Sequence, residues 1–322
     1  MGVIKELIID HSFDGIPLPQ QLVVIGAYNK NDIQESQERT PYMQYVGANR
    51  NTSSQMMEFS VRPPPLSFQR YERLVTFELE DTKLRDFIQG LLNNASFDKV
   101  MKHASFYEGA PSDIEEIIER DKVIAVWWLS AAFELYKEST YLRVHASIRD
   151  IARSVRFTLH FVQNFNLFQF KAVFRAMKEM IRNGILHQLP KPFELCLLLS
   201  VYLCYYLRVP VAQVGGCLNR NDFFRLLSGK FNSPHIRAML DSASLIISCV
   251  TDRVYSMTEG FRGDDVKDTL LFKENVFALV CSIHARVPVM IVGPPGCSKT
   301  LSWSVVKKCF SGSNDGPELF KS

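Results

Sequence analysis

The sequence predicts an α/β fold joined to an all-α region, and three observations support this prediction. Residues 22–27 (LVVIGA) form a continuous apolar run, typical of a strand buried on both faces of a parallel sheet. From about residue 81 the apolar residues recur at helical spacing. Towards the other end, an apolar run at 287–292 leads into a glycine-containing loop and a further helical pattern. Sheet-forming ends therefore flank a long helical middle.

Composition narrows the class of protein further. The chain has 322 residues, 37 basic and 34 acidic side chains and 47% hydrophobic residues, as in an ordinary globular protein. A net charge of +3 is too small to indicate a nucleic-acid partner. The seven cysteines include no CxxC pair, so neither a zinc site nor a disulfide framework is indicated, and the first thirty residues lack a signal-peptide pattern. We therefore expect a cytoplasmic location and no transmembrane segment.

The amino-terminal part, residues 1–80, contains two expected strands, 4–9 and 22–27, separated by the turn sequence DGIPLP. Asn29 follows the second strand at once, and the carboxyl ends of strands are where open α/β sheets bind ligands. The alternative is that Asn29 only caps a turn. Residues 33–58 are polar and rich in turn formers, which indicates a long surface loop.

Two helices are clearest in the region 81–257, after a first candidate at 84–92. Ser112 and Glu115 form a capping box before an amphipathic run that extends to about residue 136, with two tryptophans, Trp127 and Trp128, expected in the core. Ser147 is expected to cap the next helix, SIRDIARSVRFTLHFV.

Arg149 and Arg153 lie four residues apart on that second helix. Their guanidinium groups stand one turn above the other and could reach the same anion. A solvated basic face is the plainer interpretation of the pair.

Residues 193–207 (FELCLLLSVYLCYYL) form the longest apolar stretch. Fifteen residues rise about 22 Å as a helix, less than the roughly 30 Å of a bilayer core, so a buried helix is favoured over a membrane span. Further helices are expected at 222–227, 234–255 and 269–285.

The motif with the clearest chemistry is Gly293-Pro-Pro-Gly296-Cys297-Ser298-Lys299-Thr300, between the expected strand 287–292 and a helical pattern from residue 301. A phosphate loop needs backbone N–H groups that point inward and a helix amino end behind them. Lys299 would contact the β- and γ-phosphates, and the Thr300 hydroxyl would bind Mg²⁺. The signature G-x-x-x-x-G-K-[ST] is met except at its second glycine, which is Ser298.

An ATPase of this class also needs an acidic strand end that holds Mg²⁺, and a polar sensor, both from later strands. Thr300 lies 22 residues before the end of the sequence. We therefore expect the nucleotide site to be completed by residues outside this chain. Conversely, Asn29 has no glycine loop before it, so the ends look like parts of two consecutive units.

This pattern resembles the AAA+ ATPases, and more narrowly the dynein-like AAA+ core of the mysterin family of giant ubiquitin ligases. The resemblance rests on DGIPLPQQLVVIGAYN, SVRPPPLSF, HASIRDIARSV and the junction LLFKENVFALVCSIHARVPVMIVGPPGCSKTLSWSVV. It implies a partial P-loop NTPase α/β subdomain at 1–80, a helical lid at 81–257, and the first strand, P-loop and helix of a second unit at 258–322. In that family a serine at the position of Ser298 is expected.

The resemblance also implies site roles and partners. Asn29 would be sensor 1, and Arg149, or failing that Arg153, would be the sensor 2 arginine of the lid. Arg39 or Arg50 is a candidate arginine finger. ATP and Mg²⁺ would be the cofactors and the rest of an intramolecular ring the partner, with ubiquitin-conjugating machinery engaged only through a longer parent protein. The alternative is a helical protein-interaction module with a vestigial phosphate loop.

Overall fold

The computed structural model describes most of the chain from residue 81 onward and two short strands before it. The described residues are 12–13, 16–17, 81–93, 95–107, 113–138, 147–209, 218–263, 268–291, 296, 298–311 and 317–321. The chain separates into two compact units, Met1–Phe77 and Glu78–Ser322. The expected strands 4–9 and 22–27 and the loop 33–58 lie outside the described residues, as do Asn29, Arg39, Arg50, Gly293 and Cys297.

In the first unit the described strands form one antiparallel pair. Strand β1 (Ser12–Phe13) pairs with β2 (Ile16–Pro17), with Phe13 opposite Ile16. Between them the sequence reads Asp-Gly, a pair that favours two-residue hairpin loops. Strand β2 therefore lies within DGIPLP, the sequence expected to form a turn.

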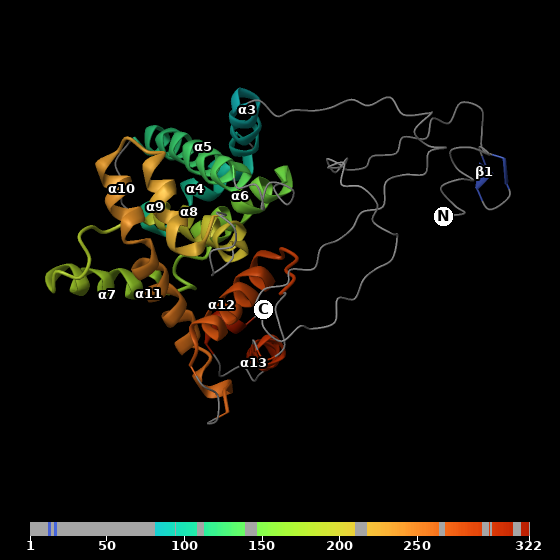
Figure 1. The fold of residues 1–322 in the computed structure, drawn as a ribbon, viewed down its shortest axis with the longest axis vertical. Coiled ribbons are helices and arrows are strands. Elements are labelled where there is room, and N and C mark those ends of the chain that lie inside the picture. The colour runs from blue at the N-terminus through green and yellow to red at the C-terminus, as the bar shows by residue number, and fades with distance from the viewer. Residues whose placement is uncertain are drawn as a thin grey trace, which may run out of the picture. The chain divides into compact units, whose positions relative to one another are not determined.

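The described part of the second unit is helical (Figure 1). Its α-helices, in chain order, are α3 (Asp81–Leu92), α4 (Ala95–Lys102), α5 (Ile114–Glu138), α6 (Ile148–Gln163), α7 (Phe170–Arg182), α8 (Pro192–Cys204), α9 (Arg220–Gly229), α10 (Pro234–Asp241), α11 (Ala243–Ser256), α12 (Leu270–Ala285) and α13 (Lys299–Ser311). Short 3₁₀ turns lie at Ser105–Tyr107, Tyr206–Arg208, Glu259–Phe261 and Glu318–Phe320.

Helix α8 forms the centre of this unit. Every residue from Phe193 to Tyr202 is buried, and Pro192 occupies the first turn, where its missing N–H is harmless. The helix packs mainly on α6, and the Thr158 hydroxyl donates to the Ser200 hydroxyl across that interface at 3.0 Å. The expectation of a buried helix is confirmed. In the part of the chain that the structure describes, no helix is long and apolar enough to cross a membrane.

Helix α6 begins where its sequence predicts. The Ser147 side chain accepts from the Arg149 N–H, and the Asp150 carboxylate accepts from the Ser147 N–H at 3.0 Å, which completes a capping box. The same carboxylate, almost fully buried, also pairs with Arg208 at 2.9 Å and with Arg153 at 3.2 Å. This cluster fixes the start of α6 against the 3₁₀ turn Tyr206–Arg208 that follows α8.

Three sequence expectations need correction. Residues 287–291, the described part of the expected strand, form no strand, and Val289 and Met290 are 44% and 84% exposed. A β-strand exists only through pairing with a neighbour, and the described residues supply none. The expected helix 234–255 is broken at Ser242 into α10 and α11. Trp128 is buried as expected, but Trp127 is half exposed, with the Arg85 guanidinium 4.5 Å from the ring centre.

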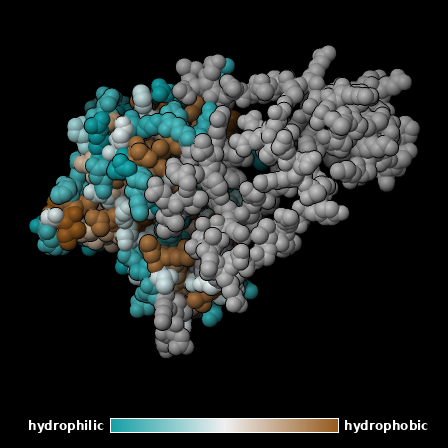
Figure 2. Space-filling view, viewed as in Figure 1, coloured by the Kyte–Doolittle hydropathy of each residue, from teal (hydrophilic) through white to brown (hydrophobic). Residues whose placement is uncertain are grey.

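The carboxyl-terminal helices α12 and α13 pack on one another (Figure 1). Helix α13 buries Ser302, Val305, Val306 and Cys309 and leaves Trp303 half exposed. A hydrophobic patch over α12 is visible in Figure 2, and the exposed apolar residues of that helix include Leu270, 67% exposed, and Leu271, 41% exposed. Apolar surface of this kind commonly marks a face that contacts another element or protein.

Candidate functional site

The described part of the glycine-containing loop is its last turn before α13. Gly296 has φ +84° and Ser298 has φ +57°, both in the left-handed region. A residue with a Cβ adopts that region at a cost of roughly 1–2 kcal/mol. Ser298 therefore holds the backbone conformation that the second glycine of the signature would adopt freely.

Helix α13 begins directly after this turn, at Lys299. Its first intrahelical bond is firmly placed, because the Ser302 N–H donates to the Ser298 carbonyl at 2.8 Å, and the Ser302 hydroxyl donates to the same oxygen at 2.8 Å. The N–H groups of a helix's first turn have no acceptor within the helix and point out of its amino end. This end of α13 therefore presents donors and the positive end of the helix dipole towards the loop.

The two side chains expected to contact a nucleotide differ in exposure. Lys299 is partly buried, whereas Thr300 is exposed. The Thr300 carbonyl accepts from the Ser304 hydroxyl at 2.9 Å, so its backbone is part of the helix. The structure thus places Gly296, Ser298, Lys299 and Thr300 in one turn, while Gly293 and Cys297 lie outside the described residues.

The two arginines expected to contact an anion, Arg149 and Arg153, are also distinguishable. Both lie on α6, as expected, but the Arg153 guanidinium is paired with Asp150, whereas the Arg149 guanidinium makes no hydrogen bond or ion pair with any described residue. Arg149 is exposed and lies in the first turn. Of the two side chains, Arg149 is the one that is available to bind an anion.

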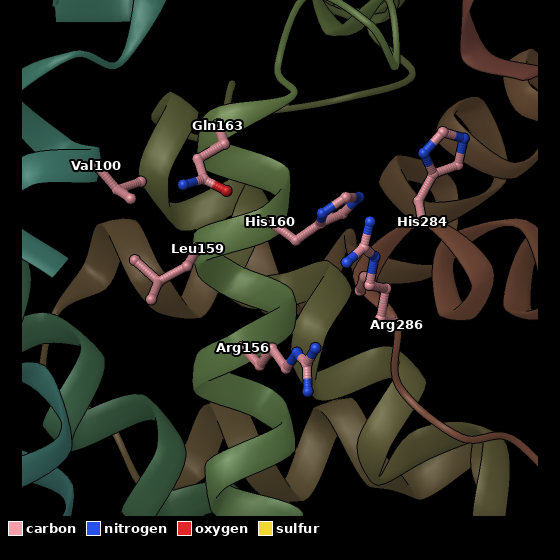
Figure 3. A pocket seen from close by; sticks show the side chains of 8 residues that line it. Val100, Arg156, Leu159, His160, Gln163, His284 and Arg286 are labelled. Carbon is pink, nitrogen blue, oxygen red and sulfur yellow. The ribbon is translucent and has the colours of Figure 1, made fainter. Parts of the chain in front are cut away.

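A group of residues that the motif analysis missed lines a pocket between α6 and α12. Its volume is about 270 Å³, and its polar walls are Arg156, His160 and Gln163 from α6 with His284 and Arg286 from the end of α12 (Figure 3). The two imidazole rings lie 5.9 Å apart. The three polar residues from α6 continue the helical spacing of Arg149 and Arg153 along that helix. This spacing is the only sequence signal for them.

Burial decides the charge of the two histidines. Burial, with smaller contributions from the neighbouring His284 and Arg156 side chains, lowers the pKa of His160 from 6.5 to about 4. Burial also lowers the pKa of His284, although the Leu319 carbonyl opposes this by accepting a hydrogen bond from its Nε2. Both rings are therefore neutral at pH 7, and the arginines carry the charge of the pocket.

Comparison with known proteins shows what this chain is similar to. Residues 265–322, which include α12, the loop and α13, match the family model described as "RNF213 AAA domain". The E3 ubiquitin-protein ligase RNF213 of Homo sapiens is 23% identical over 334 aligned residues that cover the whole of this chain. The chain is homologous to the mysterin-type AAA+ region. The resemblance expected from the sequence is therefore confirmed.

Other relatives cover less of the chain. An E3 ligase of Danio rerio, rnf213-beta, is 26% identical over 54% of it, and a protein of Dictyostelium discoideum named as an uncharacterized transmembrane protein is 30% identical over 51%. This chain spans 6% of the human relative and 3% of each of these two. No solved structure matches it.

Proposed function

We propose that the chain is an ATP-binding segment of the AAA+ region of a mysterin-like E3 ubiquitin ligase, with residues 293–300 as its phosphate loop. One observation carries the proposal. Ser298 takes the left-handed conformation, with φ +57°, at the point where α13 begins. A serine is strained there, and strain of this kind persists where the surrounding structure and its role require it. The homology to RNF213 AAA sequence supports the same interpretation.

In this proposal the loop binds the phosphates of ATP through the N–H groups of residues 296–300 and the amino end of α13. Lys299 contributes an ammonium group to the β- and γ-phosphate oxygens, and Thr300 contributes a hydroxyl ligand to Mg²⁺. Bound Mg²⁺ supplies neutralisation of the phosphate charge. The exposure of Thr300 leaves its hydroxyl accessible from solvent.

The nucleotide site is proposed to need further strands for hydrolysis. Val289 and Met290 expose apolar side chains next to the loop, and Trp303 does so on α13. Such surface is what the remaining strands and helices of an α/β subdomain would cover. The acidic strand end that positions Mg²⁺ and water would come with them, so the chain alone is expected to bind ATP without hydrolysing it.

The preceding unit would contribute Asn29 as sensor 1 and Arg149 as sensor 2. Arg149 is favoured over Arg153 for that role, because among the described residues the Arg149 guanidinium has no partner whereas the Arg153 guanidinium pairs with Asp150. The proposed division is an α/β part at 1–80, a lid at 81–257 and the start of the next unit at 258–322. Partners would be the rest of the AAA+ ring and, through a longer parent protein, the ubiquitin-conjugating machinery.

We propose a cytoplasmic location because the described cysteines are not in disulfide bonds. Every cysteine among the described residues is a free thiol, namely Cys196, Cys204, Cys249, Cys281 and Cys309. Unpaired thiols are typical of reducing compartments.

The test is a titration of the purified chain with a fluorescent ATP analogue in the presence of Mg²⁺, combined with an assay of ATP turnover. We expect saturable binding, at least tenfold weaker in Lys299→Ala, and no turnover. Lys307→Ala is the matched control, because Lys307 is an exposed lysine of the same helix and should bind as the unsubstituted chain does.

Two results would contradict the proposal. Turnover that requires Mg²⁺ and is lost in Lys299→Ala would show that the site is complete within the chain. Binding that is absent, or equal in the Lys299 and Lys307 variants, would favour the alternative of a helical interaction module with a vestigial loop.

A further inference from the structure

The pocket between α6 and α12 has an unbalanced positive charge. Arg156 and Arg286 both line it, neither is paired with a carboxylate among the described residues, and no aspartate or glutamate contributes to the lining. The carboxyl ends of α6 and α12 lie at this pocket and contribute about half a negative charge each. Two full guanidinium charges exceed that, so the field in the pocket favours an anion.

His160 supplies a hydrogen-bond donor whose direction the structure fixes. The Asn164 side-chain nitrogen lies 3.0 Å from the His160 carbonyl oxygen, which can only accept, so the amide orientation is set. The same nitrogen lies 3.2 Å from His160 Nδ1, which must therefore accept. In the neutral ring the proton is then on Nε2.

This Nε2–H is buried and has no partner among the described residues. A buried donor without an acceptor costs about 1–3 kcal/mol, so such groups are normally satisfied by a ligand or a water. Figure 3 shows the His160 ring pointing from α6 towards the space that Arg286 also reaches. The pocket thus combines two guanidinium groups with an oriented N–H donor that has no acceptor among the described residues.

The second histidine forms a fixed wall of the pocket. His284 donates from Nε2 to the Leu319 carbonyl, which holds its ring against the 3₁₀ turn at Glu318–Phe320. A cation is a poor occupant beside two guanidinium groups, and no group of metal ligands is present among the described residues. The lining includes none of residues 296–300, so this pocket is separate from the phosphate loop.

We propose that this pocket binds the phosphate group of a small anion, either inorganic phosphate or a small phosphomonoester. Guanidinium groups match phosphate oxygens in a bidentate geometry. The His160 Nε2–H is covered in this structure, so it would donate to a third oxygen once the neighbouring side chains move aside for the anion. A volume of about 270 Å³ is below the usual 300–1,000 Å³ of sites for larger ligands, which favours a small occupant. Because it would contact both α6 and α12, the anion would stabilise their packing.

The experiment measures the thermal midpoint of Lys299→Ala, in which the phosphate loop is disabled, against inorganic phosphate and against glycerol 3-phosphate at constant ionic strength. Arg156→Gln, Arg286→Gln and His160→Phe are each added to that background. Arg175→Gln is the control, because Arg175 is an exposed arginine of α7 outside the pocket. Since the loop is disabled throughout, failure of this proposal is distinguishable from failure of ATP binding.

We expect a saturable rise in the midpoint with at least one of the two anions, and the one that binds more tightly identifies the source of the phosphate group. The apparent dissociation constant should rise at least tenfold in each arginine variant and about threefold to tenfold in His160→Phe, and stay unchanged in Arg175→Gln. If the arginine variants do not fold, His160→Phe decides, since it keeps both charges and a ring of similar size. No saturable effect, or an equal effect in Arg175→Gln and the pocket variants, would overturn the proposal.

Discussion

Ser298 is the residue that most directly connects backbone geometry to the proposed chemistry. Its φ of +57° places a side chain in the conformation that the phosphate-loop signature reserves for glycine. The sequence alone showed the departure from the signature, but only the structure shows that the serine adopts the glycine conformation. The strain is local and should be measurable.

Replacing Ser298 by glycine should stabilise the second unit by up to about 1 kcal/mol, because the left-handed penalty disappears and exceeds the extra entropy of glycine in the unfolded chain. Chemical denaturation gives the free energy of unfolding. The same replacement at Ser304, in the interior of α13, should destabilise by about 0.5–1 kcal/mol. If both glycine variants changed the free energy of unfolding in the same direction, the left-handed conformation of Ser298 would be contradicted.

Arg220 and Glu274 form a nearly buried ion pair that joins α9 to α12. Their Nη1 and Oε2 atoms are 2.8 Å apart, and the side chains are only 14% and 7% exposed. Arg220 also donates to the carbonyls of Val209 at 3.0 Å and Leu207 at 2.9 Å. Its guanidinium thus joins three separate segments of the fold.

Glu274→Gln should lower the free energy of unfolding by about 2–4 kcal/mol, because it leaves the buried guanidinium without a counter-charge. The neighbouring residue provides the control, since Lys273 pairs with Asp252 at 2.7 Å near the surface, and Lys273→Ala should cost no more than about 1 kcal/mol. A similar loss in both variants would show that burial does not distinguish the two pairs.

Helices α6 and α12 meet at the two histidines, and the titration of His160 gives this contact a pH dependence. The pKa of His160 is lowered to about 4, so between about pH 6.5 and 4 the unfolded chain binds a proton that the folded chain does not. The contribution of the neutral His160 to the free energy of unfolding is therefore complete above about pH 6.5 and is lost as the pH falls towards 4. His284, whose pKa is also lowered, acts in the same direction.

We expect the free energy of unfolding to be about 1–2 kcal/mol lower at pH 5 than at pH 7.5 from His160 alone. Urea titrations at the two pH values measure the difference. His160→Phe should remove that part of it, whereas His187→Phe, at an exposed position, should not. An unchanged pH dependence in His160→Phe would show that His160 is not the titrating group.

Elements with a strong local signal were predictable from the sequence. The start of α6 follows from Ser147 and Asp150, which satisfy its first N–H groups whatever the helix packs against. The burial of α8 follows from an apolar run too short to span a bilayer. The turn into α13 follows from glycines and a following helical pattern, and α13 begins within two residues of the expected start.

The features of the fold and of the pocket that could not be predicted depend on contacts between residues distant in the sequence. Residues 287–291 have the composition of a strand, but pairing needs a neighbour that local sequence does not specify. Trp127 and Trp128 are adjacent and equally apolar, but Trp128 is buried against Phe231, with ring centres 5.5 Å apart, whereas Trp127 lies half exposed beside Arg85 of α3. His160 and His284 are separated by most of the helical region, so their meeting in one pocket has no signal in sequence spacing.

At the scale of the whole molecule, the division at Phe77 and Glu78 separates the chain into two units, and the described helices of the second share one core. Removal of residues 1–77 should therefore leave a chain that unfolds cooperatively with an unchanged thermal midpoint, within about 2 °C. Circular dichroism and calorimetry of the shortened chain measure this. A loss of cooperativity would show that the helical unit depends on the first.

The central claim is that residues 293–300 bind ATP, and hydrogen exchange of the backbone amides tests it most directly. Peptides that cover residues 290–302 should exchange more slowly on addition of ATP and Mg²⁺, because the N–H groups of residues 296–300 would donate to phosphate oxygens. Lys299→Ala should lose this protection. Protection that is absent from these peptides, or that persists in Lys299→Ala, would contradict the account.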